Sequence, residues 1–177
     1  MIPPLARRFV AGETTAGALE HARQCNEEGI GVILNQLGEH YDRREPAAEA
    51  TATYEALVEE IDLAGLDACL SIKPSQLGLD VSEALFQSNL DSVVTHAADR
   101  DVFVWIDMED HTTTDATLDA FERLARQTDG GVGVCVQANL RRTPDDLERL
   151  ADLPGKIRLV KGAYDPPASV ALQDKAE

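Results

Sequence analysis

The segment 68–107, ACLSIKPSQLGLDVSEALFQSNLDSVVTHAADRDVFVWID, contains the pattern on which the fold prediction depends. It begins with a short apolar run, continues through a stretch at 81–100 with helical periodicity, and ends with a second short apolar run. Buried strands that alternate with helices are typical of a parallel sheet covered by helices. We therefore predict one β–α–β unit in this segment.

The same alternation continues on both sides of this unit. The repeat is the βα unit itself, about 30 residues long and present roughly four and a half times. No linker separates a second domain, so residues 1–177 are interpreted as one α/β domain. Further helices are predicted at 14–28, 46–64, 114–128 and 143–153, and further strands at 29–37, 131–137 and 156–164. The expected N-caps are Thr14, Thr143 and one of Thr112, Thr113 or Thr114, and Pro46 and Pro144 lie in first helical turns.

Two architectures are built from such units, and each has support in the sequence. Five strands complete an open doubly wound sheet, whereas a (β/α)8 barrel needs eight strands and about 250 residues. The strand count therefore favours the open sheet. Ser71 and Arg158, however, are polar residues inside apolar runs, which suits a barrel interior that lines a ligand. The count and the residue pattern disagree, so both architectures stay open at this point.

Acidic residues outnumber basic ones two to one. The chain has 32 Asp and Glu against 16 Lys and Arg, a formal net charge of −16. Nucleic-acid binding depends on a basic surface, so no nucleic-acid partner is expected. A salt-adapted cytoplasm is one interpretation, because a densely carboxylated surface stays hydrated in concentrated salt. An acidic mesophilic protein is the other interpretation, and both stay open.

The sequence also bears on the cellular compartment. No apolar run approaches the ~18 residues of a membrane span, and the start of the chain, MIPPLARRFVAGE, lacks the apolar core of a signal peptide. Cys25, Cys69 and Cys135 are odd in number and far apart, so we expect reduced core thiols and no disulfide. These features predict a cytoplasmic chain.

Four apolar runs end on a polar residue: Lys73, Asp107, Gln137 and Lys161. The carboxyl ends of parallel strands open onto one rim, where ligands bind. Lys73 could hold a carboxylate there or be a solvated lysine at a strand end. Asp107 could orient an amine or transfer a proton, or it could cap a helix. The amide of Gln137 suits the edge of a heterocycle.

The run IRLVKGAY at 157–164 carries the most informative polar residues. Arg158 lies inside the strand and needs a partner if it faces inward. Gly162 and Ala163 are small enough to let the backbone approach a phosphate or a ribityl chain. Arg158 and Lys161 differ in strand parity, so both face a ligand only if Lys161 lies past the regular strand. His111 has no second histidine at ligand spacing, and no metal site is predicted.

Six segments together give the chain a specific resemblance to a known family. They are ARRFVAGET, GIGVILNQLGE, SIKPSQLGL, WIDMEDHTTTDAT, GVCVQANLRRT and IRLVKGAY. In this order they resemble the proline dehydrogenase family, flavin enzymes that oxidise L-proline. The resemblance implies a distorted (β/α)8 barrel with FAD at the strand ends, truncated here to about five βα units. This implied barrel takes precedence over the strand count, which favours the open sheet.

The resemblance also implies residue roles. Lys73 resembles a lysine beside the substrate, and Asp107 resembles the active-site aspartate. Arg158 resembles the arginine near the reactive nitrogen of the flavin, where a fixed positive charge favours the reduced ring. The implied flavin contacts are Met108, Gln137, Lys161, Gly162 and Ala163.

The implied reaction converts L-proline to Δ1-pyrroline-5-carboxylate and passes electrons to a membrane quinone, which would place the chain at the inner face of the membrane as a peripheral protein. The family's last three strands and its paired arginines have no counterpart in the sequence. The resemblance therefore implies that Lys73 loses its glutamate partner and that the outer strands have open edges. One hypothesis is a truncated or split enzyme, inactive alone and completed by a second chain. A non-catalytic remnant and an unrelated five-stranded binding protein are the alternatives.

Overall fold

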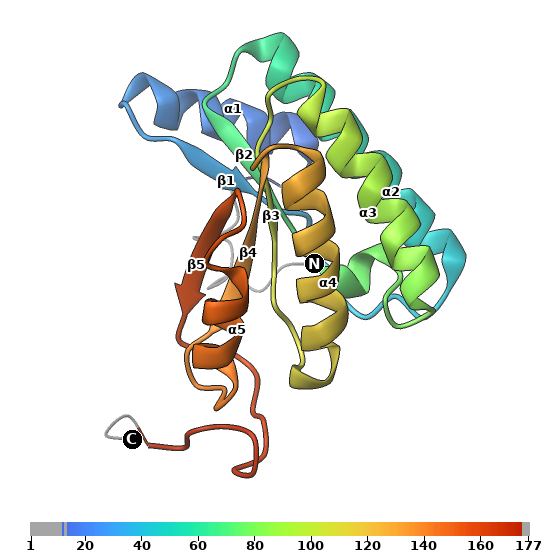
Figure 1. The fold of residues 1–177 in the computed structure, drawn as a ribbon. Helices are drawn as coiled ribbons and strands as arrows, with labels where there is room; N and C mark the ends of the chain where they lie inside the picture. Colours follow the sequence, from blue (N-terminus) through green and yellow to red (C-terminus); the bar gives the residue numbers. More distant parts are fainter. Residues whose placement is uncertain (1–11, 13, 175–177) are drawn as a thin grey trace.

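The computed structural model describes residue 12 and residues 14–174, in which helices and strands alternate along the chain (Figure 1). The five strands are β1 (Val32–Leu34), β2 (Ala68–Ile72), β3 (Val104–Ile106), β4 (Val132–Gln137) and β5 (Lys156–Val160). The five α-helices are α1 (Thr15–Glu27), α2 (Arg44–Ala64), α3 (Glu83–Ala98), α4 (Thr114–Gln127) and α5 (Thr143–Leu150). Two short 3-10 helices, η2 (Pro74–Leu77) and η3 (His111–Thr113), follow β2 and β3.

The strands form one parallel sheet in the order β1-β2-β3-β4-β5. Each strand therefore pairs with the next strand along the chain. All their carboxyl ends lie at one end of the sheet, where the segments that follow them meet. This end is called the rim below.

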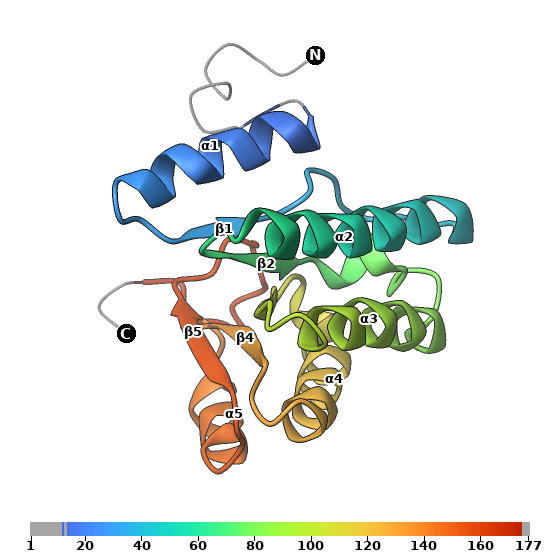
Figure 2. The same cartoon turned by 90° about the horizontal axis from the view of Figure 1, so that it is seen from above.

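The sheet is curved, and the helices lie in an arc along its outer side (Figure 2). Leu70, Ile106 and Val134 are fully buried members of the apolar core on this outer side. Ser71 and Cys135 alternate with the core residues and point to the inner side of the arc. A doubly wound sheet carries helices on both faces, so the open-sheet interpretation is wrong and the barrel interpretation is confirmed. Five parallel strands form half of a (β/α)8 barrel.

The helix N-termini show which of the predicted N-caps form. Thr14 caps α1, because its hydroxyl accepts the N–H of Gly17. The predicted cap at Thr143 is wrong, since that hydroxyl donates to the carbonyl of Gln137 and Arg142 takes the cap position. The cap position of α4 is Thr113, one of the three expected threonines, but its side chain accepts no capping hydrogen bond.

Both ends of the sheet order are open within the described residues. β1 and β5 each pair with one neighbour only. Ile33 on β1 is 48% exposed and Leu159 on β5 is 59% exposed, although strand residues of this kind are normally covered. Unpaired strand edges with exposed apolar side chains favour pairing with further strands.

The thiols and the helices add two smaller results. Cys25, Cys69 and Cys135 are all free, as expected, but only Cys135 is buried and the other two are half-buried. Among the described residues, no helix combines the length and the apolar character needed to cross a bilayer.

Candidate active site

A cluster of polar side chains lies on the inner face of the half-barrel, just below the rim. Its centre is an ion pair between Nη2 of Arg158 and Oδ1 of Asp107, 2.7 Å apart. The hydroxyl of Ser71 donates to the same oxygen at 2.7 Å, and the thiol of Cys135 donates to it at 3.3 Å. Arg158 in turn donates to Cys135 Sγ at 3.0 Å and to Ser71 Oγ at 3.1 Å. The strand arginine therefore has the partner that the sequence required.

Strand parity brings this cluster together. Ser71, Cys135 and Arg158 lie at inward positions of β2, β4 and β5, and Cys135 pairs in register with Arg158. Asp107 follows β3 directly, two residues after Trp105. The guanidinium of Arg158 lies 5.1 Å from the centre of the Trp105 ring, a cation–π distance.

The thiol at the centre of the cluster is held in its neutral form. Burial, followed by the negative charge of Asp107, raises the pKa of Cys135 to about 12. The thiol therefore stays protonated near neutral pH and can donate to Asp107.

Gln137, at the end of β4, is buried with one half of its amide unpaired. Its Nε2 donates to the backbone carbonyl of Glu109 at 2.7 Å, whereas its Oε1 is buried without a hydrogen-bond partner among the described residues. A buried polar atom without a partner is costly. An acceptor in this position suits a ligand that carries an N–H group.

Glu109 is a buried carboxylate that holds the neighbouring 3-10 helix at the rim. It accepts the backbone N–H of Ser75 at 2.7 Å and the hydroxyl of Ser75 at 2.8 Å. Burial raises its pKa above the ordinary value, although both hydrogen bonds act in the opposite direction. Sequence reasoning gave Glu109 no site role.

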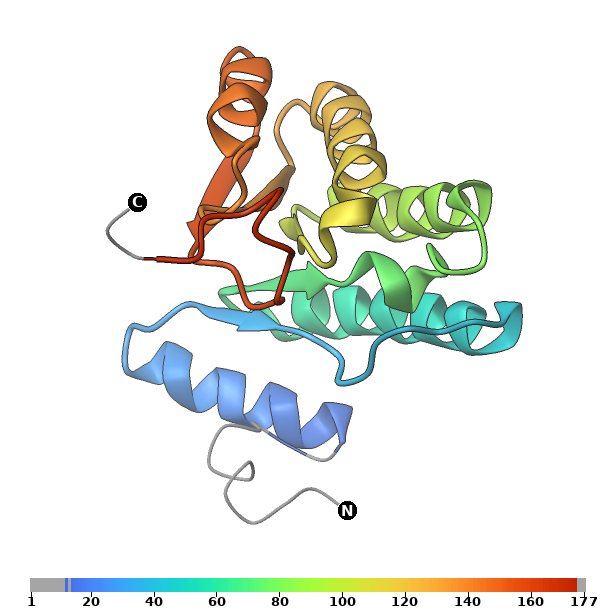
Figure 3. The same cartoon turned by 90° about the horizontal axis from the view of Figure 1, so that it is seen from below.

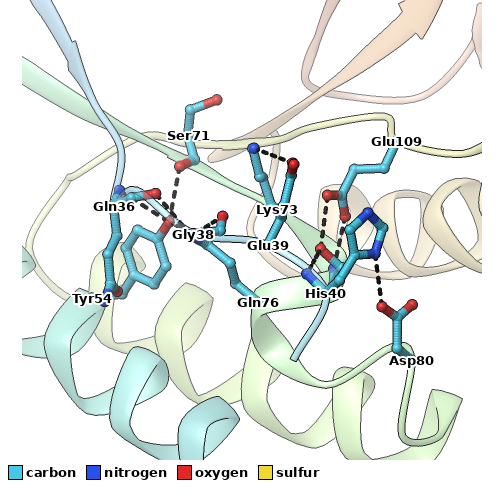
Figure 4. Close-up of polar contacts among 11 residues, drawn as sticks. Gln36, Gly38, Glu39, His40, Tyr54, Ser71, Lys73, Gln76, Asp80 and Glu109 are labelled. Atoms are coloured by element: carbon cyan, nitrogen blue, oxygen red, sulfur yellow. Dashed lines mark hydrogen bonds and ion pairs between the residues drawn. The ribbon is translucent and has the colours of Figure 1, made fainter. Parts of the chain in front are cut away.

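Lys73, which follows β2 at the rim, has a carboxylate partner (Figure 4). Its Nζ lies 2.7 Å from Oε2 of Glu39, in the loop after β1. The hydrogen bond and the charge of Lys73 lower the pKa of Glu39. Lys73 therefore has a carboxylate partner within this chain, Glu39 of the segment NQLGE, whereas the expected loss of the family glutamate near the paired arginines stays a prediction.

The turn after β5 carries an exposed lysine, and its backbone passes close to a neighbouring side chain. Lys161 is exposed and lies just past the last residue of β5, as the parity argument required. Gly162 has a φ of 109°, and a Cβ there would collide with the side chain of Asn139. Glycine is therefore required at this position. Ala163 follows it and is exposed.

Met108 directly follows Asp107 in the chain but is not one of the residues that form the polar cluster. Its side chain is buried and belongs to the apolar core. A flavin-lining role for Met108 stays a prediction.

The segment after the turn crosses the rim end of the sheet, seen from below in Figure 3. It is tied to the segment after β4 by backbone hydrogen bonds from Arg141 to Val170 and from Leu172 to Asn139. Tyr164 lies near the rim carboxylates. Burial first, and then Glu109 and Glu39, raise the pKa of Tyr164 to about 12.

The rim and the inner face just below it therefore combine a partly buried ion pair, an unpaired buried acceptor and a lysine–glutamate pair. Asp107 and Arg158 are in direct contact, while Lys73 belongs to a second group with Glu39. Glu39, Glu109 and Cys135 were missed as site residues. For Cys135 a signal existed, because it lies two residues before Gln137 and hence on the same strand face. No group of three or more His, Cys, Asp or Glu side chains in the described part of the chain could hold a metal ion.

Comparison with known proteins identifies the family. The family model described as proline dehydrogenase matches residues 18–167. The chain belongs to the proline dehydrogenase family. The family is one of oxidoreductases, so the chain is related to enzymes by descent, and the resemblance noted from the six segments is confirmed.

Curated members of the family match almost the whole chain. Proline dehydrogenase of Deinococcus radiodurans is 37% identical over 177 residues, which cover 98% of this chain and 57% of the relative. Proline dehydrogenase 1 of Bacillus subtilis (strain 168) is 35% identical over 170 residues, 96% of this chain and 56% of the relative. The chain thus spans little more than half the length of these relatives.

A solved structure supports the fold. The chain superposes on proline utilization A (PutA) from Bdellovibrio bacteriovorus, inactivated by N-propargylglycine, with a TM-score of 0.80. The match covers 90% of this chain and 20% of that chain at 22% sequence identity. Five strands of the proline dehydrogenase barrel are therefore present here, in the same arrangement.

Proposed function

We propose that this chain supplies the flavin and proline contacts of five βα units to a proline dehydrogenase that converts L-proline to Δ1-pyrroline-5-carboxylate. The observation that carries the proposal is the Asp107–Arg158 pair on the inner face, supported by Ser71 and Cys135. An ion pair with so many partners is a fixed charge pattern, and such patterns stabilise charge that develops in a reaction. In a chain of this family, that pattern suits amine oxidation.

FAD is the cofactor that the family implies, and two observations agree with it. The buried, unpaired Oε1 of Gln137 can accept an N–H of a heterocycle. Gly162 lets the backbone pass close to Asn139 and leaves no Cβ on this turn, which suits a ribityl or phosphate group. When bound, FAD supplies the acceptor for the two electrons that proline gives up.

The side chains of this chain then have defined tasks. Arg158 holds a positive charge where the reduced cofactor is negative, and Asp107 orients the amine of proline and takes up its proton. Lys73 lies beside the substrate, with Glu39 fixing its position. Gln137, Lys161, Gly162, Ala163 and Met108 complete the flavin-side surface of these five units.

Activity needs the remaining strands of the barrel. The sheet has open edges at β1 and β5, and the curated relatives are almost twice as long as the matched region. We refer to this chain joined by the further barrel strands of such a relative, in a longer chain or as a second polypeptide, as the completed barrel. A quinone is the proposed final electron acceptor, which would bring the protein to the inner face of the membrane.

A second candidate function is a half-barrel that binds a partner without catalysis. The exposed apolar residues Ile33 and Leu159 at the two open edges favour this alternative. The two proposals predict different results in an activity assay. In the second, the chain bound to its partner would not oxidise proline.

A dye-reduction assay with L-proline tests the proposed function. We expect no measurable activity from the 177-residue chain alone and activity from the completed barrel. Asp107→Ala and Arg158→Ala should each lower kcat/KM at least ~10-fold, about 1.4 kcal/mol. Wild-type rates in either variant would remove the role assigned to that residue.

A surface ion pair of the same type provides the control. Nη2 of Arg123 lies 2.6 Å from Oδ1 of Asp91 between α4 and α3, far from the rim. Arg123→Ala and Asp91→Ala should leave kcat/KM within about twofold, because exposed pairs contribute little. A loss equal to that of Arg158→Ala would show that the assay reports stability and not the site.

A further inference from the structure

The loop after β1, residues 36–41, is called the rim loop here. Figure 4 shows that it lies against η2, which follows β2. Glu39 is in the middle of this loop, exposed to solvent except for its contact with Lys73. An exposed glutamate has many side-chain rotamers and gains little from a single surface pair. The position of Glu39 must therefore be set by the backbone that carries it.

One buried side chain holds the first half of the rim loop. Gln76 of η2 is 0% exposed, and its Nε2 donates to the carbonyl of Gln36 at 2.8 Å and to the carbonyl of Gly38 at 2.7 Å. Both N–H groups of the amide are used on the loop, which leaves no donor for other partners. A buried amide with all its polar groups paired specifies one arrangement.

Tyr54 of α2 orients the side-chain amide of Gln76. Its hydroxyl donates to Oε1 of Gln76 at 2.6 Å and accepts the backbone N–H of Gln36 at 3.3 Å. Burial raises the pKa of this phenol, so it remains a neutral donor. The orientation of the Gln76 amide is thereby determined, since its oxygen must face the phenol and its nitrogen the loop.

The second half of the rim loop is held by Ser75. Ser75 Oγ accepts the N–H of His40 at 3.0 Å, and the Ser75 carbonyl accepts the N–H of Tyr41 at 3.2 Å. Ser75 itself is bound by Glu109, as described above. Glu39 therefore lies between two anchored stretches, and η2 carries both anchors and directly follows Lys73.

We propose that Gln76 and Tyr54 are positioning residues for the Glu39–Lys73 pair: the buried amide of Gln76, oriented by Tyr54, holds the rim loop so that Glu39 meets Lys73 at the rim. The importance of the pair for proline rests on the proposed function, but the positioning does not. Gln76 acts through the carbonyls of the loop and touches neither Glu39 nor Lys73.

The titration of the Glu39 carboxyl, followed by carbon-13 NMR of the 177-residue chain, tests the proposal. In the native chain Lys73 lowers the pKa of Glu39, and Lys73→Met shows the pKa without that partner. Gln76→Met keeps the volume and removes the amide, so the pKa of Glu39 should rise at least half of the way to its value in Lys73→Met. Tyr54→Phe removes only the hydroxyl and should raise the pKa in the same direction by a smaller amount.

The control variant removes a hydrogen bond from the other side of η2. Asn89 Nδ2 donates to the carbonyl of Leu77 at 3.0 Å, and Asn89→Leu should leave the titration of Glu39 unchanged. A folded Gln76→Met chain with the native Glu39 titration overturns the proposal. If Gln76→Met does not fold, Tyr54→Phe decides, and an unchanged titration in that variant overturns the proposal.

The completed barrel separates this inference from the proposed function. There, Gln76→Met and Glu39→Gln should raise the KM for proline by similar factors, with smaller effects on kcat. The NMR titration needs neither flavin nor proline. A completed barrel without activity would therefore contradict the proposed function and leave the positioning result unaffected.

Discussion

Cys135 shows how much of a residue's environment can be predicted from the sequence. The sequence suggested a reduced core thiol, and the thiol is free and buried. The structure shows in addition that it lies between Asp107 and Arg158 as a hydrogen-bond donor to one and an acceptor from the other. Pairing between β4 and β5 creates this contact, and a single sequence does not reveal such pairing.

The pKa of Cys135 gives a prediction at this scale. The negative charge of Asp107 raises this pKa toward about 12, while Arg158 lowers it. Asp107→Asn should therefore lower the pKa of Cys135 and speed its alkylation by iodoacetamide at mildly alkaline pH, measured by peptide mass spectrometry. Arg158→Met should act in the opposite direction. Equal alkylation rates of Cys135 in both variants and the native chain would show that the cluster does not control the thiol.

Gly133 gives a second prediction. A Cβ at Gly133 would lie 2.5 Å from the ring of Trp105 and 2.9 Å from the carbonyl of Lys156. Gly133→Ala should lower the free energy of unfolding by about 1–3 kcal/mol through overpacking, measured by urea denaturation. Gly17→Ala in α1 is the control, because its Cβ meets nothing closer than 3.4 Å. A Gly133→Ala chain as stable as the native one would contradict the placement of Trp105 on the inner face.

At the scale of elements, the positions of the helices and strands were predictable, but several caps and contacts were not. The α2 helix ends at Ala64, as predicted, because Gly65 adopts a left-handed φ of 59°. Thr143 was misassigned, since its hydroxyl is used by a strand end across the loop. The rim loop has neither helical nor alternating periodicity, so Glu39 and its anchors could not be predicted from pattern.

His40 in the rim loop gives an element-scale prediction about pH. Its Nδ1 lies 2.9 Å from Oδ2 of Asp80, and this contact raises the pKa of His40, with Glu109 and Glu39 adding to it. The stabilising contribution is complete below the ordinary histidine pKa of 6.5 and is lost as the pH rises through the raised folded-state pKa. Proton NMR should show His40 titrating above 6.5 in the native chain and at a lower pH in Asp80→Asn. Identical titration in both would contradict the contact.

At the scale of the whole molecule, the described residues form a half-barrel with its helices on the outer side and two strand edges that pair with no further strand. The sequence predicted the number of strands and that they form a parallel sheet, but not the order in which they pair. The strand count alone suggested the wrong architecture, because it does not show on which face the helices pack. The polar residues Ser71 and Arg158 inside apolar runs suggested the right one, since they line the inner face.

Self-association of the chain tests whether the open strand edges are contact surfaces. The chain alone should form larger species in sedimentation velocity, more so at higher salt, because salt screens the repulsion of a net charge of −16. Leu159→Lys on β5 should reduce this association. Leu63→Lys is the control, because Leu63 on α2 is 81% exposed but lies away from both edges. Equal effects of the two variants would mean that the edges are not the contact surface.

The visible absorption spectrum of the completed barrel tests the central claim most directly. The claim is that the rim binds FAD and presents it with L-proline, next to Asp107 and Arg158. We predict that the purified completed barrel shows the bands of oxidised flavin, and that L-proline bleaches them in the absence of oxygen, far more slowly in Arg158→Ala. A folded completed barrel that carries no flavin, or one whose bound flavin L-proline does not bleach, would contradict the account.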